Sequence, residues 1–387
     1  MTIAYITSVF TLHFSNLADE LYKLTNGQFW FIEINPITEE NIIKLPSGTN
    51  FYDKPYLMQT WRSEDEEQKA IKIIKNVDVL LISGGYAASK YEKMRIETGK
   101  LTFEPTERQL KRGFLNAFSK TSISYAWLYY VVGHKNLYKL CLSAFTANDM
   151  YVLHPFFRDK CYKFGYFTEV PVLDIKKVIL SRRNNKLIKI LWTARLVKLK
   201  HPEFPILMAK ILKDKGYKIE VNIVGDGKKM PELKRMIKKL SVSDCVNLLG
   251  RQTNERVYQL MREHDIFTFT SNKREGWGAV LNEAMSCGCA CVVSDLIGAA
   301  PYLIKAGING YTFKTGDIGS FVSYVQKLID DREKREEIQY NAYNTMLELW
   351  NPRVAAVNFC RLAESILHGS PISIKEGPCS LALPVKL

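Results

Sequence analysis

The stretch Arg274–Gly288, REGWGAVLNEAMSCG, places two carboxylates on either side of a run that is broken by glycines. Its glycines permit a tight turn with uncovered backbone amides, and the residues from Ala279 onward favour a helix packed by small side chains. A helix start of this kind attracts anions, because its first N–H groups lack partners. The carboxylates of Glu275 and Glu283 are suited to hydrogen bonds with hydroxyl groups. The stretch therefore predicts a phosphate site flanked by sugar or ribose hydroxyls.

The chain on both sides of this stretch alternates short apolar runs with amphipathic segments, which is the pattern of parallel α/β units. The expected strands of this half are Lys189–Ala194, Lys218–Val224, Val246–Gly250, Asp265–Thr270, Cys289–Ser294 and Gly310–Phe313. The expected helices are Glu203–Lys215, Pro231–Leu240, Asn254–Glu263, Ile318–Asp330 and Glu333–Glu348. A last helix over Pro352–Leu367 is expected to cross back to the N-terminal half.

The N-terminal half shows the same alternation. Its expected elements are strands at Thr2–Val9, Phe29–Ile34 and Val77–Ser83 and a helix near Asn16–Thr25. The third strand, VDVLLIS, is continuously apolar, as are strands buried on both faces of a parallel sheet. Ligands bind beyond the carboxyl ends of such strands, so the loop around His13 can face a substrate. The following Gly84 and Gly85 can do the same or can only form a turn.

The segment Glu104–Lys120, EPTERQLKRGFLNAFSK, has the features of a helix start. Pro105 suits a first helical turn, Thr106 can cap it, and acidic residues precede basic ones. We therefore expect a helix to begin close to Glu104.

A chain of 387 residues exceeds a usual single core, so we expect two domains. The expected divisions are an N-terminal α/β domain over residues 1–172, a C-terminal α/β domain over 173–352, a helix over 353–368 and an irregular tail over 369–387. Disorder is expected only in that tail, because a hydrophobic content of 47% supports full globular cores elsewhere.

Eight cysteines without framework spacing indicate reduced thiols. Cys287, Cys289 and Cys291 alternate along an expected strand, where a metal cluster can be imagined, but no histidine supports one and buried core residues are the favoured interpretation. His134 and His154 lack neighbouring ligands at suitable spacing, and the chain has no HExxH motif. No metal site is therefore expected.

The formal net charge of +14 is concentrated in the second half of the chain, and residues 1–172 carry only about +2 of it. Such a basic surface suits nucleic acid, an anionic membrane surface or a polyphosphate ligand. Nucleic acid is disfavoured, because no nucleic-acid-binding motif accompanies the charge and the basic residues are spread over helix faces that we expect to be solvated.

The first residues, MTIAYITSVFTLHF, lack the basic start and the small-residue cleavage site of a secretion signal, so a cytosolic protein is expected. No run reaches the roughly 18 uninterrupted apolar residues of a membrane-spanning helix. Ser124–Val132, SYAWLYYVV, is nevertheless aromatic and apolar. With the basic helices, this segment would allow peripheral docking on an anionic membrane.

Arg195 and Lys200 bracket the loop between an expected strand and an expected helix. Two cations at such a loop can hold a diphosphate, or they can simply be solvated. The turn Gly225-Asp226-Gly227 follows the next strand and by itself is weak support for a nucleotide.

Four motifs in the second half occur together and in a fixed order. They are R-x4-K at Arg195 and Lys200, G-x-G at Gly225 and Gly227, E-x7-E at Glu275 and Glu283, and the small-residue turn Ala284–Gly288. With these motifs the second half resembles the large retaining glycosyltransferase family often called family four. Its fold, GT-B, consists of two Rossmann-like domains with parallel sheets that face each other across a cleft.

The resemblance implies a nucleotide diphosphosugar donor in the C-terminal domain. It puts Glu275 near the hydroxyls of the donor sugar and Glu283 on the ribose hydroxyls, and it assigns the diphosphate to Arg195 and Lys200. The other donor-binding groups that it implies are the turn at Gly225 and Gly227 and the backbone amides of Trp277, Gly278 and Ala279.

The resemblance also implies transfer with retention of the anomeric configuration. The chain contains no D-x-D motif, which agrees with a transferase that needs neither metal nor cofactor, because fixed positive groups can stabilise the leaving diphosphate. A sugar-phosphate phosphorylase or epimerase of the same fold, or a non-catalytic module that binds sugar nucleotides, are the alternatives.

The acceptor half is less clearly marked. The segments TFEPTERQLKRG and KFGYFTEV look like those of bacterial family members that assemble surface polysaccharides. The expected acceptor is therefore a saccharide or a lipid-linked saccharide, approached by Glu104, Glu107 and Arg108. His13 is a candidate for the histidine that faces the donor sugar in many relatives.

Overall fold

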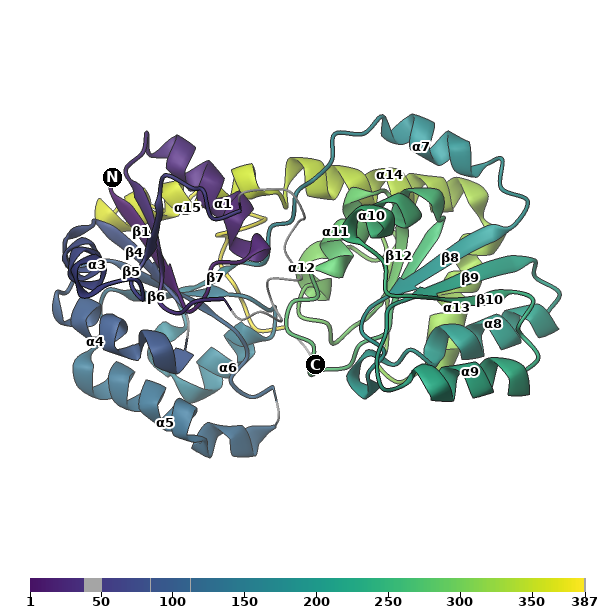
Figure 1. The fold of residues 1–387 in the computed structure, drawn as a ribbon, viewed down its shortest axis with the longest axis horizontal. Helices are drawn as coiled ribbons and strands as arrows, with labels where there is room; N and C mark the ends of the chain where they lie inside the picture. Colours follow the sequence, from purple (N-terminus) through teal and green to yellow (C-terminus); the bar gives the residue numbers. More distant parts are fainter. Residues whose placement is uncertain (38–50, 84, 112, 386–387) are drawn as a thin grey trace. The chain divides into compact units, whose positions relative to one another are not determined.

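The computed structural model describes residues 1–37, 51–83, 85–111 and 113–385 (Figure 1). They form two compact units, one of residues Met1–Thr168 with the chain from Pro352 onward, and one of residues Glu169–Asn351. Each unit is an α/β domain with a parallel sheet, as the sequence predicts. The first division falls within a few residues of the expected boundary at 172.

Within the described residues of the first unit, seven strands form a parallel sheet in the order β3-β2-β1-β4-β5-β6-β7. The strands are β1 (Ile3–Thr7), β2 (Phe29–Glu33), β3 (Leu57–Gln59), β4 (Val79–Ile82), β5 (Thr102–Thr106), β6 (Leu137–Cys141) and β7 (Cys161–Lys163). The strand order reverses between β1 and β4. A crevice for ligands is expected at such a switch point, beyond the carboxyl ends of the strands.

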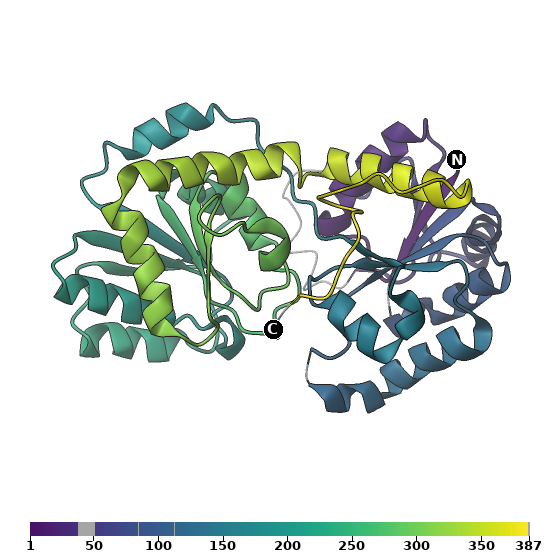
Figure 2. The ribbon, with the colours of Figure 1, turned by 180° about the vertical axis from the view of Figure 1, so that it is seen from behind.

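Helices cover both faces of this sheet (Figure 1). They include α1 (Leu12–Leu24), α3 (Glu64–Asn76), α4 (Ser89–Glu97), α5 (Lys120–Trp127), α6 (Thr146–Leu153) and α15 (Pro352–Leu367). The last helix, α15, packs beside α1, so it crosses back to the N-terminal unit as expected (Figure 2).

The tail beyond α15 is irregular but ordered against the first unit, contrary to the expectation of disorder. Cys379, Ser380 and Ala382 are buried. The tail exchanges backbone hydrogen bonds of 2.7 to 2.9 Å with Cys161 and Lys163 of β7. An edge strand leaves its N–H and C=O groups unpaired on one side, and the tail satisfies them.

The expected helix at Glu104–Lys120 is wrong. Glu104 to Thr106 instead end β5, a buried strand paired in parallel with both β4 and β6. Helical structure resumes only with a 3₁₀ turn at Phe114–Phe118 and with α5. Pro105 suggested a first helical turn, but as the second-last residue of the strand it costs the ladder only one donor.

Within the described residues of the second unit, six strands form a parallel sheet in the order β10-β9-β8-β11-β12-β13. The strands are β8 (Ile188–Thr193), β9 (Ile219–Val224), β10 (Val246–Gly250), β11 (Ile266–Phe269), β12 (Ala290–Ser294) and β13 (Tyr311–Phe313). Their bounds agree with the expected strands to within about two residues. Cys287, Cys289 and Cys291 are buried free thiols, as the packing interpretation requires, but only Cys291 lies within β12, whereas Cys287 caps the end of the helix Val280–Ser286.

The helices of the second unit also lie on both faces of its sheet (Figures 1 and 2). They are α7 (Ile175–Arg182), α8 (Phe204–Asp214), α9 (Met230–Lys239), α10 (Asn254–Glu263), α11 (Val280–Ser286), α12 (Ala300–Leu303), α13 (Ile318–Asp330) and α14 (Arg332–Glu348). Helix α11 contains Glu283, so whatever fixes α11 also fixes one half of the E-x7-E motif.

Arg182, at the end of α7, fixes α11 through its backbone. The buried guanidinium donates hydrogen bonds to the carbonyl oxygens of Cys287 at 2.9 Å and Gly288, just beyond α11. It also donates to those of Met261 at 3.1 Å and Arg262 at 3.0 Å, at the end of α10. Carbonyls in the last turn of a helix have no partner within the helix, and a cation is favoured there.

We expect Arg182→Ala to lower the free energy of unfolding by about 3 kcal/mol, because four carbonyls lose a charged donor and three of these hydrogen bonds are buried. Urea titration of the purified protein measures this loss. The matched control is Arg183→Ala, which removes an exposed ion pair to Glu336 and should change stability little. Equal effects of the two substitutions would contradict this role for Arg182.

Candidate functional site

The turn before α11 is shaped by close backbone packing. Gly278 has a φ of +90°, and a Cβ there would lie 2.7 Å from the ring of Phe269, so only glycine fits. The N–H of Ala299 donates to the carbonyl of Trp277 at 3.0 Å and fastens the turn to the next loop. The stretch therefore forms the tight turn that the sequence predicts, and both the Phe269 ring and the loop at Ala299 hold it in place.

The amides of this turn are uncovered, as predicted. The backbone N–H groups of residues 276–279 donate no hydrogen bond to any residue that the structure describes. The Trp277 side chain is buried against Tyr302 and Trp350, and its Nε1–H donates to Asn282 Oδ1 at 2.8 Å. With the indole directed into the core, consecutive amides remain for an anionic ligand.

Lys200 and Glu275 form an ion pair that joins the R-x4-K and E-x7-E segments. Both side chains are largely buried, with exposed fractions of 12% and 13%. The Lys200 ammonium also lies 5.0 Å from the ring centre of Phe269. The hydroxyl of Thr270 donates to the Lys200 carbonyl at 2.8 Å, so the two loops are also fastened through the backbone.

The backbone residues on either side of Arg195 each lie against a glycine of the next loop. A Cβ on Gly225 would lie 1.9 Å from the carbonyl oxygen of Ala194, and one on Gly227 would lie 2.6 Å from that of Leu196. The two glycines thus allow the loops after β8 and β9 to touch on either side of Arg195. The Arg195 side chain is exposed, and among the described residues its guanidinium has no hydrogen bond or ion pair. No described contact joins it to Lys200 or Glu275.

Glu283 lies in the first turn of α11 and is mostly buried. Its carboxylate makes no hydrogen bond or ion pair with the described residues. Burial without a compensating partner raises the pKa of Glu283 to about 7. A carboxyl of this kind gains from any ligand that brings hydroxyl donors.

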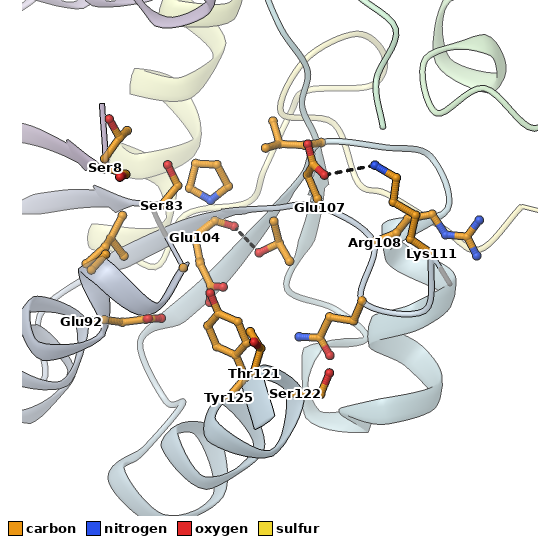
Figure 3. A pocket seen from close by; sticks show the side chains of 18 of the residues that line it. Ser8, Ser83, Glu92, Glu104, Glu107, Arg108, Lys111, Thr121, Ser122 and Tyr125 are labelled. Atoms are coloured by element: carbon orange, nitrogen blue, oxygen red, sulfur yellow. Dashed lines mark hydrogen bonds and ion pairs between the residues drawn. The ribbon is translucent and has the colours of Figure 1, made fainter. Parts of the chain in front are cut away.

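The first unit contains a cavity of about 730 Å³ beyond the carboxyl ends of β1, β4 and β5 (Figure 3). This is the switch point of the sheet. Glu104, Glu107 and Arg108 all line it, and so does Gly85. Gly84, the other glycine named from the sequence, lies outside the described residues.

Charged groups at one side of this cavity are paired with one another. Glu107 lies 3.6 Å from the ammonium of Lys111 and accepts a hydrogen bond of 3.2 Å from the Tyr166 hydroxyl. Arg108 pairs with Asp149 at 3.4 Å, while its buried Nε has no partner among the described residues. This side of the cavity therefore presents carboxylates and cations that neutralise one another.

His13 is not among the residues that line the cavity. Its ring stacks on that of Tyr166, which does line it, at 4.8 Å between centres. Burial lowers the pKa of His13, so the ring is neutral near pH 7. A contact between His13 and the donor sugar stays a prediction. His134 stacks on Phe156, and His154 is buried, so both side chains have packing roles.

Two polar residues of the cavity were not singled out from the sequence. Glu92 of α4 is only 2% exposed, and Gln109 is 9% exposed with its Nε2 lacking a partner in the described structure. The α4 segment, SKYEKMRIE, has no apolar stripe, which is unusual for a helix packed on a sheet. The missing apolar stripe was therefore the signal in the sequence that could have indicated a polar residue buried on α4.

Across the described ranges, no group of three or more His, Cys, Asp or Glu side chains could hold a metal ion. In the same ranges, no helix is both long and apolar enough to cross a membrane.

Comparisons with known proteins concern mainly the second unit. A family model described as Glycosyl transferases group 1 matches residues 177–345. The chain is 32% identical over 126 residues to N-acetyl-alpha-D-glucosaminyl L-malate synthase of Bacillus anthracis, covering 33% of this chain and 32% of that protein. It is 32% identical over 146 residues to the amylovoran biosynthesis glycosyltransferase AmsK of Erwinia amylovora, covering 36% of each. The matches span about a third of these relatives.

Solved structures are similar over nearly the whole chain. The Anabaena protein HepE, crystallised in complex with UDP and glucose, matches 94% of this chain and 100% of its own, with a TM-score of 0.67 and 15% identity. At that identity the likeness concerns the fold alone. Residues 177–345 thus match the model of the group 1 glycosyl transferases, and the two α/β units have the fold of the GT-B glycosyltransferases.

Proposed function

We propose that the protein transfers a sugar from a nucleotide diphosphosugar to an acceptor hydroxyl, with retention of the anomeric configuration, in polysaccharide or glycolipid assembly. The observation that carries this proposal is the ion pair between Lys200 and Glu275. It puts a cation suited to phosphate beside a carboxylate suited to sugar hydroxyls. The one relative named for amylovoran biosynthesis, AmsK, and the UDP complex of HepE support the same class of reaction.

Departure of the nucleoside diphosphate is the step that the second unit supports. Arg195, Lys200 and the uncovered amides of residues 276–279 are preorganised positive groups for the leaving diphosphate. A diphosphate offers Lys200 a second anion in addition to Glu275. Glu275 then holds hydroxyls of the donor sugar, and Glu283 accepts hydrogen bonds from the ribose. The acceptor hydroxyl attacks the face from which the diphosphate leaves, which retains the configuration.

The acceptor is a saccharide that binds in the cavity of the first unit. The cavity is large enough for a sugar unit and lies at the switch point of its sheet. Glu104, Glu107 and Arg108 supply acceptors and donors for its hydroxyls. A lipid-linked saccharide suits the site best, because the same segment of chain also carries an apolar surface.

This surface, the α5 ridge, occupies and flanks α5. Its members are exposed by 49% to 83%: Phe114, Leu115, Phe118, Ile123, Trp127, Tyr130 and Val131. Thr121, Ser122 and Tyr125 of the same helix line the cavity (Figure 3). Exposed lysines flank the ridge at Lys120 and Lys135. Apolar and basic groups together favour docking on the anionic, cytosolic face of a membrane.

We expect Arg195→Ala, Lys200→Ala and Glu283→Ala each to lower the rate of transfer at least about tenfold, about 1.4 kcal/mol of transition-state binding. The donor for this assay is the UDP-, GDP- or ADP-sugar that most raises the melting temperature of the wild type. Lys198→Ala, an exposed lysine of the same loop, is the matched control.

Wild-type rates in all three variants would contradict the assignment. Wild-type protein incubated with donor alone tests the alternatives. An altered sugar would indicate an epimerase. Donor binding without any turnover, with or without acceptors, would indicate a binding module.

The raised pKa of Glu283 makes stability depend on pH. Its carboxyl binds its proton more tightly in the folded state, so its contribution to stability is complete below about pH 4.5 and is lost as the pH rises through about 7. We expect Glu283→Gln to remove this loss. Between pH 5 and pH 8 the free energy of unfolding of the variant should therefore rise, relative to that of the wild type, by about 2 kcal/mol. Denaturant titrations at several pH values measure the difference. Glu348→Gln, an exposed site, should follow the wild type.

We expect the protein to float with vesicles that contain phosphatidylglycerol at low salt. Replacing Leu115, Phe118 and Trp127 of the α5 ridge together by serine should abolish flotation, because these side chains supply the apolar contact. Val172→Ser, at a site 93% exposed in the second unit, is the control and should still float. A wild type that stays unbound would contradict the membrane proposal.

A further inference from the structure

The inner end of the cavity in the first unit carries a buried group of charges. Glu104 of β5 stands opposite Lys139 of β6 in the strand register, and the two side chains form an ion pair. The Tyr129 hydroxyl donates to Glu104 Oε2 at 2.7 Å. Lys139 is completely buried and Glu104 nearly so, at 4% exposure. One carboxylate and one ammonium thus balance in charge.

Glu92 is a second carboxyl at the same place and has no cation of its own. It comes from α4 and points toward Glu104 and Tyr125 (Figure 3). Its Oε1 is buried and lacks a hydrogen-bond partner in the described structure, although the carboxyl is within hydrogen-bonding reach of Glu104. A buried polar atom without a partner costs about 1 to 3 kcal/mol, so its retention calls for a reason.

Gln109 provides an independent observation at the same cavity. Its buried Nε2 has no acceptor among the described residues, while its Oε1 lies 3.4 Å from His154 Nε2. An acid and an amide donor, from separate segments, are therefore both left unsatisfied where they line one cavity. Hydrogen-bonding groups of a ligand would satisfy both.

The charge of Glu92 follows from what surrounds it. Burial, and next the charge of Glu104, raise the pKa of Glu92 well above its ordinary range, although Lys139 opposes them. This shift of the pKa favours the protonated, uncharged form of Glu92. The titratable groups that face this cluster from the neighbouring strands and helices are Glu104, Lys139, Tyr125, Tyr129 and His154. Burial keeps both tyrosines and His154 neutral, so the cluster as a whole carries no net charge.

We propose that Glu92, Glu104 and Gln109 form the binding floor for an uncharged, hydroxyl-bearing sugar ring of the acceptor. A neutral carboxylic acid both donates to and accepts from a sugar hydroxyl, and the Gln109 amide donates to another. A sugar carboxylate is rejected, because it would meet Glu104 in a buried setting. The identity of this sugar as the acceptor rests on the proposed function, whereas its binding to the floor does not.

The test titrates the full-length protein with methyl α-glucopyranoside, methyl α-galactopyranoside and methyl N-acetyl-α-glucosaminide, followed by ligand-detected NMR. We expect Glu92→Leu to lower the affinity for the best-binding glycoside by at least about tenfold, because the hydrogen bonds between Glu92 and the glycoside are lost. Glu92→Gln keeps a neutral donor and acceptor and should stay within about threefold of the wild type. The matched control is Glu97→Gln, an exposed glutamate on the same helix, which should bind as the wild type does.

Two further readouts separate a binding role from a structural one. Glucuronic acid should compete at least about tenfold less well than glucose at pH 7, because burying its charge beside Glu104 is unfavourable. Glycoside affinity of the wild type should fall as the pH rises and Glu92 ionises, and it should stay constant in Glu92→Gln. A Glu92→Leu variant that binds glycosides like the wild type, or a wild type that binds none of them, would overturn the inference.

The donor experiments remain a separate test. Glycosides could bind the wild type, with a lower affinity for Glu92→Leu, while no nucleotide sugar is turned over. In that case the proposed transferase function fails and the binding floor stands. If transfer occurs and Glu92→Leu changes neither glycoside affinity nor the KM for the acceptor, the floor fails and the proposed function stands.

Discussion

The buried ion pair between Lys200 and Glu275 joins two loops that are 75 residues apart in the chain. Each loop follows a strand of one parallel sheet, so strand pairing brings the loops to the same edge, and the ion pair sets their distance. Breaking a buried pair leaves an uncompensated charge, which is strongly unfavourable. The turn amides, the helix with Glu283 and the glycine-bounded Arg195 all depend on loops that this contact and its backbone bonds hold in place.

The second unit could be predicted from the sequence almost completely, because its strands are apolar runs and its loops carry motifs with fixed spacing. The first unit could be predicted less well. Pro105 was interpreted as part of a helix start, yet it is the second-last residue of a central strand. There the pairing of β5 with β4 and β6 outweighs the loss of one donor. The missing apolar stripe of α4 was the one sequence signal for Glu92, because its burial depends on residues of β5 and β6 that are distant in sequence.

The two units differ in what surrounds the cavity rather than in their cores, since both sheets pack on aliphatic and aromatic side chains. In the second unit a buried cation, Arg182, is satisfied by four carbonyl partners. The first unit buries a lysine, two glutamates and an unsatisfied amide around a cavity. Stability alone would favour apolar side chains there. Polar groups held in this way are characteristic of sites shaped for a ligand.

The packing of α15 and the tail onto the first unit affects the order in which the protein can fold during synthesis. The second unit is continuous, so its whole chain has been synthesised before Pro352 is added. The first unit begins earlier but lacks its cover on α1 and the partner of β7 until the last segment emerges. The nascent chain therefore carries an open sheet edge while the second unit closes. The domain made first is the one completed last.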